Sequence, residues 1–277
     1  MVNLPNIDGH IWDVQLRTID IISDLINHGH VQILLNNEGP DAQELGLYRI
    51  LDWICQKFSI SQQQIEIITH NQLESHPRYH ITRKVPMHLL GPCQQLISES
   101  NFVAKKQQDA KRFGIFIGRN SWERLWMTSW LYHNHKDITL MSYHYQNSLC
   151  FDDLVVNLGF DLSWKITEEF FKVIPLKLDS IDHYPILNPE NLNLLNFYRD
   201  FEIEIVCETY LKGNTFFPTE KTIRPMVGNK PFIVYGPKGF LSNLRQQENF
   251  QTFSSLWKDR KSTRLNSSHV ALSRMPS

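Results

Sequence analysis

The feature that most constrains the fold is a recurring order of short apolar runs and segments with helical periodicity. "VQILLNN" (31–37) and "IEIITHN" (65–71) are rich in β-branched residues, and apolar residues recur at helical spacing between them, over 42–57. An earlier segment with helical spacing ends at His28-Gly29. Strand, helix and strand in this order predict a βαβ unit with a parallel sheet, because the helix returns the chain to the same sheet edge.

The same order restarts after "SESNFVAKKQQDAKR" (98–112), which we interpret as a linker. The pattern predicts strands over 113–119, 138–145, 203–210 and 231–236, and helices over 122–133, 191–201, from 220 onward and over 238–248. We therefore predict an α/β protein of two Rossmann-like lobes facing a cleft. The N-terminal lobe spans 1–110 and the C-terminal lobe spans 111–258.

The tail "DRKSTRLNSSHVALSRMPS" (259–277) has no apolar periodicity. It is similar to the translation of a short-read sequencing adapter, which matches Asp259 to His269. We interpret 259–277 as an adapter-derived, disordered tail, so that the natural C-terminus after Lys258 is truncated. The alternative is a natural tail rich in Ser and Arg.

Composition excludes several classes of protein. A net charge of −1 over 277 residues gives no basic field, so we expect no nucleic-acid partner. The four cysteines are scattered without a CxxC pair, which argues against a zinc knuckle and does not indicate a disulfide framework. No basic-apolar leader is present, and no apolar run approaches the roughly 20 residues that span a bilayer. These features favour a cytoplasmic location.

The segment "FFPTEKTIRPMVGNKPFIVYGPKGFL" (216–241) gathers charged residues at the start of a predicted helix, with Thr219 as its N-cap. A helix N-terminus favours phosphate through its N–H groups and partial positive charge. Lys221 adds a point charge, Arg224 a bidentate fork, and Glu220 two acceptor oxygens for ribose hydroxyls. This set suits a nucleoside diphosphate. The alternative is an N-capped surface helix in which Glu220 and Arg224 form an i,i+4 ion pair. Under both interpretations, Pro225 predicts a short or kinked helix.

Residues 205–241 also resemble the donor-binding segment of the glycosyltransferase family that includes the α1,3-fucosyltransferases. The matching positions are Glu208-Thr209, Thr219-Glu220-Lys221, and the stretch from Lys230-Pro231 to Gly236. The resemblance implies a two-lobed GT-B fold. It implies that Glu220 binds the ribose and Lys221 binds the phosphate of a nucleotide sugar. Glu208 lies in the same donor-binding segment. Thr209 replaces the usual Asn, and Arg224-Pro225 is not the commonest continuation. These departures from the family pattern weigh against fucose as the transferred sugar more than against the binding of a nucleotide sugar.

A second match is "FGIFIGRNSWERLWMTSWL" (113–131), where the family has an Arg at the start of a helix that contacts the donor diphosphate. Arg124 fits that place, and Arg119 is the rival. The aromatic residues of this helix either pack in the core or stack on a base or sugar; they are Trp122, Trp126, Trp130 and Tyr132.

Inverting transfer requires a general base in the first lobe. Glu38 in "NNEGPD" follows the first predicted strand and is our candidate, with a plain turn residue as its alternative. His70 and His76 are further candidates. No Asp-x-Asp lies in a strand–loop context, so we expect no metal. Lys221 and Arg124 would then neutralise the leaving diphosphate.

Together these features predict a glycosyltransferase that moves a sugar, with fucose among the candidates, from a nucleoside-diphosphate sugar to a glycan hydroxyl. A GDP-sugar is favoured as donor, and transfer is expected to be inverting and to need no metal or other cofactor. The alternative is a non-catalytic interaction protein with a vestigial donor pocket. A sugar-nucleotide hydrolase or phosphatase is a third possibility.

Overall fold

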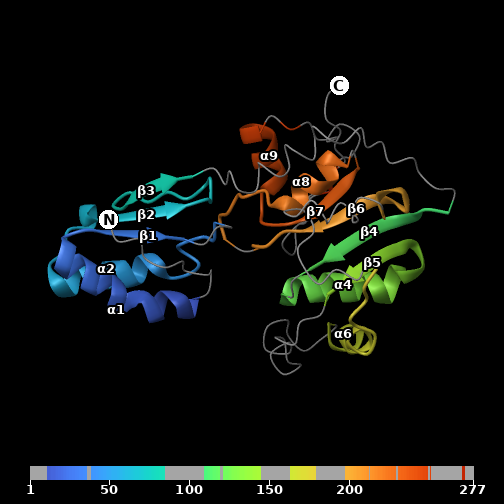
Figure 1. Cartoon of the computed structure of the whole chain (residues 1–277), viewed down its shortest axis with the longest axis horizontal. Helices are drawn as coiled ribbons and strands as arrows, with labels where there is room; N and C mark the ends of the chain where they lie inside the picture. Colours follow the sequence, from blue (N-terminus) through green and yellow to red (C-terminus); the bar gives the residue numbers. More distant parts are fainter. Residues whose placement is uncertain are drawn as a thin grey trace. The chain divides into compact units, whose positions relative to one another are not determined.

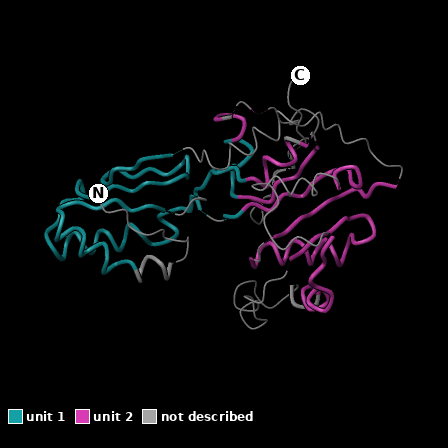
Figure 2. Tube along the Cα trace, viewed as in Figure 1, with its two compact units in different colours: residues 1–87, 209–219, 237–243 teal, residues 88–208, 220–236, 244–277 magenta. Residues whose placement is uncertain are grey.

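The structure is a computed structural model in which two compact units are distinguished (Figures 1 and 2). It describes residues 11–35, 39–84, 109–118, 121–144, 163–178, 197–211, 213–228, 230–248, 250 and 270–271. Unit 1 comprises Met1–Met87, Thr209–Thr219 and Pro237–Asn243. Unit 2 comprises His88–Glu208, Glu220–Gly236 and Leu244–Ser277. The chain is a mixed α/β protein with a mainly parallel sheet in each unit.

Unit 1 is built on a three-stranded parallel sheet in the order β1-β2-β3. Its strands are β1 (Val31–Leu34), β2 (Ile65–Thr69) and β3 (His80–Arg83). The helices α1 (Ile11–His28) and α2 (Leu47–Phe58) cover one face of the sheet, and the 3₁₀ helix η1 (Gln62–Gln64) leads into β2 (Figure 1). The core is formed where Ile21 and Leu51 of the helices pack against Ile33 and Ile67 of the strands. The predicted βαβ unit is thus confirmed.

A polar network explains why residues 209–219 join unit 1. Asn71, which follows β2, donates from Nδ2 to the carbonyl of Asn214 at 2.9 Å and accepts at Oδ1 from the N–H of Phe216 at 2.9 Å. Gly39 lies against the backbone of Asn71, and a Cβ at position 39 would come within 2.4 Å of the Asn71 nitrogen. The carbonyl of Gly39 accepts a hydrogen bond from the hydroxyl of Thr215. The units are therefore not contiguous in sequence, unlike the single boundary near residue 110 that we expected.

Unit 2 contains a five-stranded sheet in the order β5-β4-β6-β7-β8. The first four strands run parallel, and β8 is antiparallel to β7. The strands are β4 (Lys111–Ile117), β5 (Thr139–Tyr143), β6 (Phe201–Cys207), β7 (Phe232–Tyr235) and β8 (Val270–Ala271). Strand β8 lies in the tail over 259–277, and no other residue of that tail is among those described.

Helices lie on both faces of this sheet. Ile115 and Ile117 of β4 pack on one face against Leu125 and Leu131 of α4 (Trp122–His135), which is joined there by α6 (Ser163–Phe171). On the other face, Phe116 faces Arg224 of α8 (Glu220–Val227), whose guanidinium lies 5.4 Å from the ring centre. The other helical elements among the described residues are η2 (Lys136–Ile138), η4 (Phe197–Arg199) and α9 (Phe240–Glu248), of which Phe240–Asn243 belong to unit 1. Coverage of both faces defines a doubly wound sheet.

Most predicted elements are found within a few residues of their expected bounds. Of the helix expected over 191–201, residues 191–196 lie outside the described residues, and its described end is the 3₁₀ turn η4, after which β6 begins at Phe201. Phe201 is fully buried against Phe116 and Tyr198, so packing in the sheet outweighs the helical spacing of the local sequence. Apart from short 3₁₀ turns, three described elements were not predicted: β3, α6 and β8, the last within the tail that we expected to be disordered. Within the described ranges, none of the helices has the length and apolar character needed to cross a bilayer.

Candidate functional site

The strand order of unit 2 reverses direction between β4 and β6. From β4 the chain moves outward to β5, and it then returns to the other side of β4 to form β6 and, beyond it, β7. Because these strands are parallel, their carboxyl ends lie along the same edge of the sheet. In doubly wound proteins, ligands bind in the crevice outside such a reversal. The segments that follow β4 and β6 carry Arg124, Glu208, Glu220 and Lys221, four of the residues predicted from the sequence.

Arg124 lies in the first turn of α4, the helix that follows β4. The helix begins with Ser121 as N-cap, and the Ser121 hydroxyl oxygen accepts from the backbone N–H of Arg124 at 3.3 Å. The residue is 4% exposed, although an arginine rarely lies so deep without charged or polar neighbours. The cap thus fixes the position of a cation at the N-terminus of α4.

Glu208 joins the end of β6 to the first turn of α8. Its N–H donates to the carbonyl of Tyr235 at 3.0 Å, which extends the pairing of β6 with β7 by one residue. Its carboxylate accepts a hydrogen bond from the hydroxyl of Thr222 in the first turn of α8. Both side chains are buried. This contact holds the N-terminus of α8 at the carboxyl end of β6.

Glu220 and Lys221 form an ion pair at the start of α8, with Lys221 Nζ 2.6 Å from Glu220 Oε1. Burial opposes ionisation of the carboxyl, but the attraction and hydrogen bond of Lys221 outweigh it and lower the pKa of Glu220 below its ordinary value. The Lys221 side chain is 12% exposed. The pair therefore presents a charged carboxylate and a partly accessible ammonium.

The thiol of Cys207, at the end of β6, experiences the charges of both helices. Its pKa is raised to about 12, and burial is the largest cause. The positive charges of Arg124 and Lys221 lower this pKa, and the negative charge of Glu208 raises it. Arg124 lies in the first turn of α4, on one face of the sheet, and Lys221 lies in the first turn of α8, on the other. The thiol itself stays neutral and is no nucleophile at neutral pH.

Arg224 belongs to a buried polar cluster, and its charge also contributes to the lowered pKa of Glu220. Its Nε donates to Glu204 Oε1 at 3.0 Å and to the hydroxyl of Tyr198 at 3.1 Å, and its Nη2 also contacts Glu204. Burial disfavours the charged guanidinium, but Glu204 and Tyr198 outweigh it and raise the pKa of Arg224. The acceptor of Arg224 is thus Glu204 and not Glu220, which corrects the i,i+4 pair that we considered from the sequence. Its contribution to donor binding stays a prediction.

The other predicted site residues are placed as follows. Glu38 and Arg119 lie outside the described residues. His70 is buried after β2, with its ring stacked on Phe217 at 6.0 Å, and belongs to unit 1. His76 stacks on Tyr48 at 4.1 Å, and burial together with Arg78 lowers its pKa.

The aromatic residues of α4 do not act as one surface. Trp122 and Tyr132 pack against the core of unit 2, and Trp126 lies 6.5 Å from Tyr235. Trp130 is 38% exposed and contacts His135 edge-on. The packing alternative is therefore confirmed for Trp122 and Tyr132.

Two residues of this region were not singled out from the sequence, Thr222 and Cys207. The only local signal was the place of Thr222 in the first turn of a predicted helix, and its acceptor Glu208 lies 14 positions earlier. Among the residues that the structure describes, no group of three or more His, Cys, Asp or Glu side chains is arranged to hold a metal ion. Comparison of the chain with protein-family models, curated proteins and solved structures found no match.

Proposed function

We propose that this chain is a glycosyltransferase whose unit 2 binds a nucleoside-diphosphate sugar at the carboxyl ends of β4 and β6. One observation supports this most strongly. Arg124 and Lys221 lie in the first turns of two helices on opposite faces of the sheet, and these helices are in the segments that follow β4 and β6, the strands between which the order reverses. This arrangement suits a diphosphate, since each helix N-terminus adds about half a positive charge to its cation.

The carboxylates at this edge give the site its selectivity for a nucleotide over a simple anion. The ionised Glu220 offers two acceptor oxygens, which suit the paired hydroxyls of a ribose. Lys221 has three N–H donors, so its ammonium can contact a phosphate oxygen while keeping its contact with Glu220. Glu208 is engaged by Thr222 and acts by fixing the start of α8.

In the proposed reaction, the oxygen of a glycan hydroxyl attacks the anomeric carbon of the donor. The bond between that carbon and the diphosphate oxygen breaks, and the bonding electron pair leaves with the diphosphate. Arg124 and Lys221 stabilise the developing negative charge, in the role that a metal ion has in other transferases. The acceptor proton passes to a general base, for which Glu38 remains the prediction. The resemblance of residues 205–241 favours a GDP-sugar as donor.

The test is a transfer assay on the whole chain with GDP-, UDP- and ADP-sugars, each with and without oligosaccharide acceptors and in the presence of EDTA. We expect free diphosphate and an elongated glycan, both dependent on acceptor and both insensitive to the chelator. Release without an acceptor would instead identify a hydrolase. Nucleotide binding without any release would favour the non-catalytic alternative. Activity that is lost in EDTA and returns with Mn²⁺ would contradict the metal-independent mechanism.

A further inference from the structure

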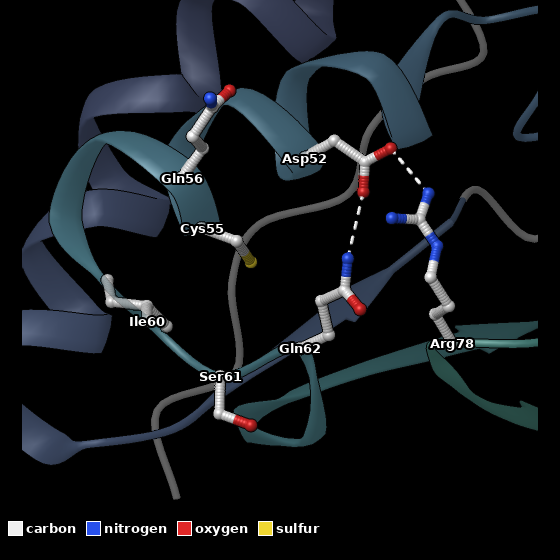
Figure 3. Close-up of a pocket in the computed structure, with 7 residues that line it drawn as sticks. All are labelled: Asp52, Cys55, Gln56, Ile60, Ser61, Gln62 and Arg78. Carbon is white, nitrogen blue, oxygen red and sulfur yellow. Dashed lines mark hydrogen bonds and ion pairs between the residues drawn. The ribbon is translucent and has the colours of Figure 1, made fainter.

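Unit 1 contains a pocket that the proposed function does not use (Figure 3). Its volume is about 530 Å³, within the range of roughly 300–1,000 Å³ that is usual for small-molecule sites. The C-terminal half of α2 forms one side, the segment from Ile60 into η1 forms the second, and Arg78 closes the third. All of these residues belong to unit 1.

One wall of the pocket is a carboxylate that is held in place from three directions. Asp52 Oδ1 accepts from Gln62 Nε2 at 3.1 Å and from the hydroxyl of Tyr79 at 2.7 Å, while Oδ2 accepts from Arg78 Nη2 at 2.6 Å. Burial opposes ionisation, but these hydrogen bonds outweigh it and lower the pKa of Asp52. The polar wall is therefore ordered before any ligand arrives, which reduces the entropy cost of binding.

The lining carries no net charge. The guanidinium of Arg78 balances the carboxylate of Asp52, and burial raises the pKa of the Cys55 thiol, which stays protonated. The other polar members are the amides of Gln56 and Gln62 and the hydroxyl of Ser61. Such a lining gives no net attraction to an anion or a cation. Each amide supplies a donor and an acceptor in the same place, as a ligand hydroxyl requires.

A smaller part of the lining is apolar. Ile60 contributes a branched hydrocarbon side chain, and the sulfur of Cys55 points into the space that the labelled residues frame (Figure 3). A ligand for this pocket should therefore present several hydroxyls around a compact C–H face and carry no charge. Carbohydrates have this combination of groups.

We propose that the pocket formed by α2, η1 and Arg78 is a binding site for a neutral saccharide. Asp52 accepts from sugar hydroxyls, and the two glutamine amides both donate to them and accept from them. Arg78 donates with the N–H groups that do not contact Asp52, and Ile60 covers a C–H face. The proposal stands on unit 1 alone and does not depend on the transferase activity.

The test is saturation-transfer NMR on the whole chain with three neutral disaccharides, lactose, cellobiose and N,N′-diacetylchitobiose. We expect transfer to the ring protons of at least one of them. The double variant Gln56→Ala with Gln62→Ala should bind that disaccharide about tenfold more weakly, as expected for the loss of one or two hydrogen bonds. Gln63→Ala is the matched control, because Gln63 lies in the same turn, is exposed and does not line the pocket.

A second readout uses the cysteine of the lining. The disaccharide that binds should slow alkylation of Cys55 by N-ethylmaleimide, as measured by mass spectrometry of the peptide that contains it. The proposal is overturned if none of the three disaccharides shows transfer to folded protein. It is also overturned if the double variant binds as the parent does, because the bound sugar then lies elsewhere. A normal response to nucleotides in the same preparation would leave the proposed function of unit 2 intact.

Discussion

Arg224 of α8 and Glu204 of β6 form an ion pair in which the carboxylate has no exposed surface and the guanidinium is 5% exposed. Breaking such a pair leaves one charge buried without its partner, which costs about 3–5 kcal/mol. We therefore expect Glu204→Gln to lower the free energy of unfolding by about that amount in urea denaturation of the whole chain.

Two further variants test this assignment. Replacing both partners with apolar residues, as Glu204→Leu with Arg224→Met, should recover most of the loss. The matched control is Glu168→Gln, which removes an exposed pair with Lys172 and should cost roughly 0–1 kcal/mol. A Glu204→Gln protein as stable as this control would show that the pair does not anchor α8.

The hydrogen bond from Thr222 to Glu208 predicts a second, smaller effect. Thr222→Val keeps the shape of the side chain but leaves the buried carboxylate without this donor, which should cost about 1–3 kcal/mol. Thr222→Ser restores the hydroxyl and should restore most of the stability. Thr128→Val is a matched control, because the Thr128 hydroxyl donates to the carbonyl of Arg124 within one helix. Removing this hydroxyl leaves no buried charge without a partner. Equal losses in both Val variants would argue against a specific Thr222–Glu208 contact.

Much of this fold follows from local sequence patterns. Short apolar runs predicted six of the strands, since apolar side chains pack on a buried sheet face. The start of α4 at Trp122 and the charged start of α8 at Glu220 were also predicted. Strand β3 was not, because "HITR" has two exposed residues and no apolar run, and its strand conformation depends on pairing with β2.

Contacts between distant residues could not be predicted from spacing. The i,i+4 rule suggested Glu220 as the partner of Arg224, whereas the actual partner is Glu204, 20 positions earlier. Likewise, the side chain of Asn71 binds backbone groups that lie 143 and 145 positions later. Such pairings depend on strand order, which local periodicity does not specify.

The Asn71 network predicts local protection of the segment that follows β6. In Asn71→Ala, the buried N–H of Phe216 loses its acceptor, and the carbonyl of Asn214 loses a donor. Amide hydrogen exchange of residues 214–216 should become about tenfold faster or more, measured by mass spectrometry of the whole chain. Exchange in β4 and β6 of unit 2 should not change. Unchanged exchange at 214–216 would contradict the anchoring role of Asn71.

The Glu220–Lys221 pair predicts a dependence of stability on pH. Because the pKa of Glu220 is lower in the folded protein, its contribution is fully present above the unfolded value of about 4.3 and is lost as the pH falls through the folded value. The stability difference between the parent protein and Glu220→Gln should therefore shrink below about pH 4.3.

Removing the cation provides the matched test. In Lys221→Gln, burial is no longer offset by the ammonium, so the pKa of Glu220 should rise. With that pKa raised toward the unfolded value, the loss of stability below about pH 4.3 should become smaller than in the parent protein. Urea denaturation at a series of pH values measures both variants. Identical pH profiles for the parent and Lys221→Gln would show that Lys221 does not set the charge state of Glu220.

The most direct test of the central claim is a thermal-shift titration of the whole chain with GDP, UDP, ADP and CMP, beside Lys221→Ala and the exposed control Lys172→Ala. A ligand that binds only the folded state raises the apparent stability, by about 2.7 kcal/mol at 100 times its Kd. We predict that one nucleoside diphosphate raises the Tm of the parent protein and of Lys172→Ala, and that Lys221→Ala loses this shift. No shift with any nucleotide in folded protein, or an equal shift in Lys221→Ala, would contradict a donor site at the start of α8.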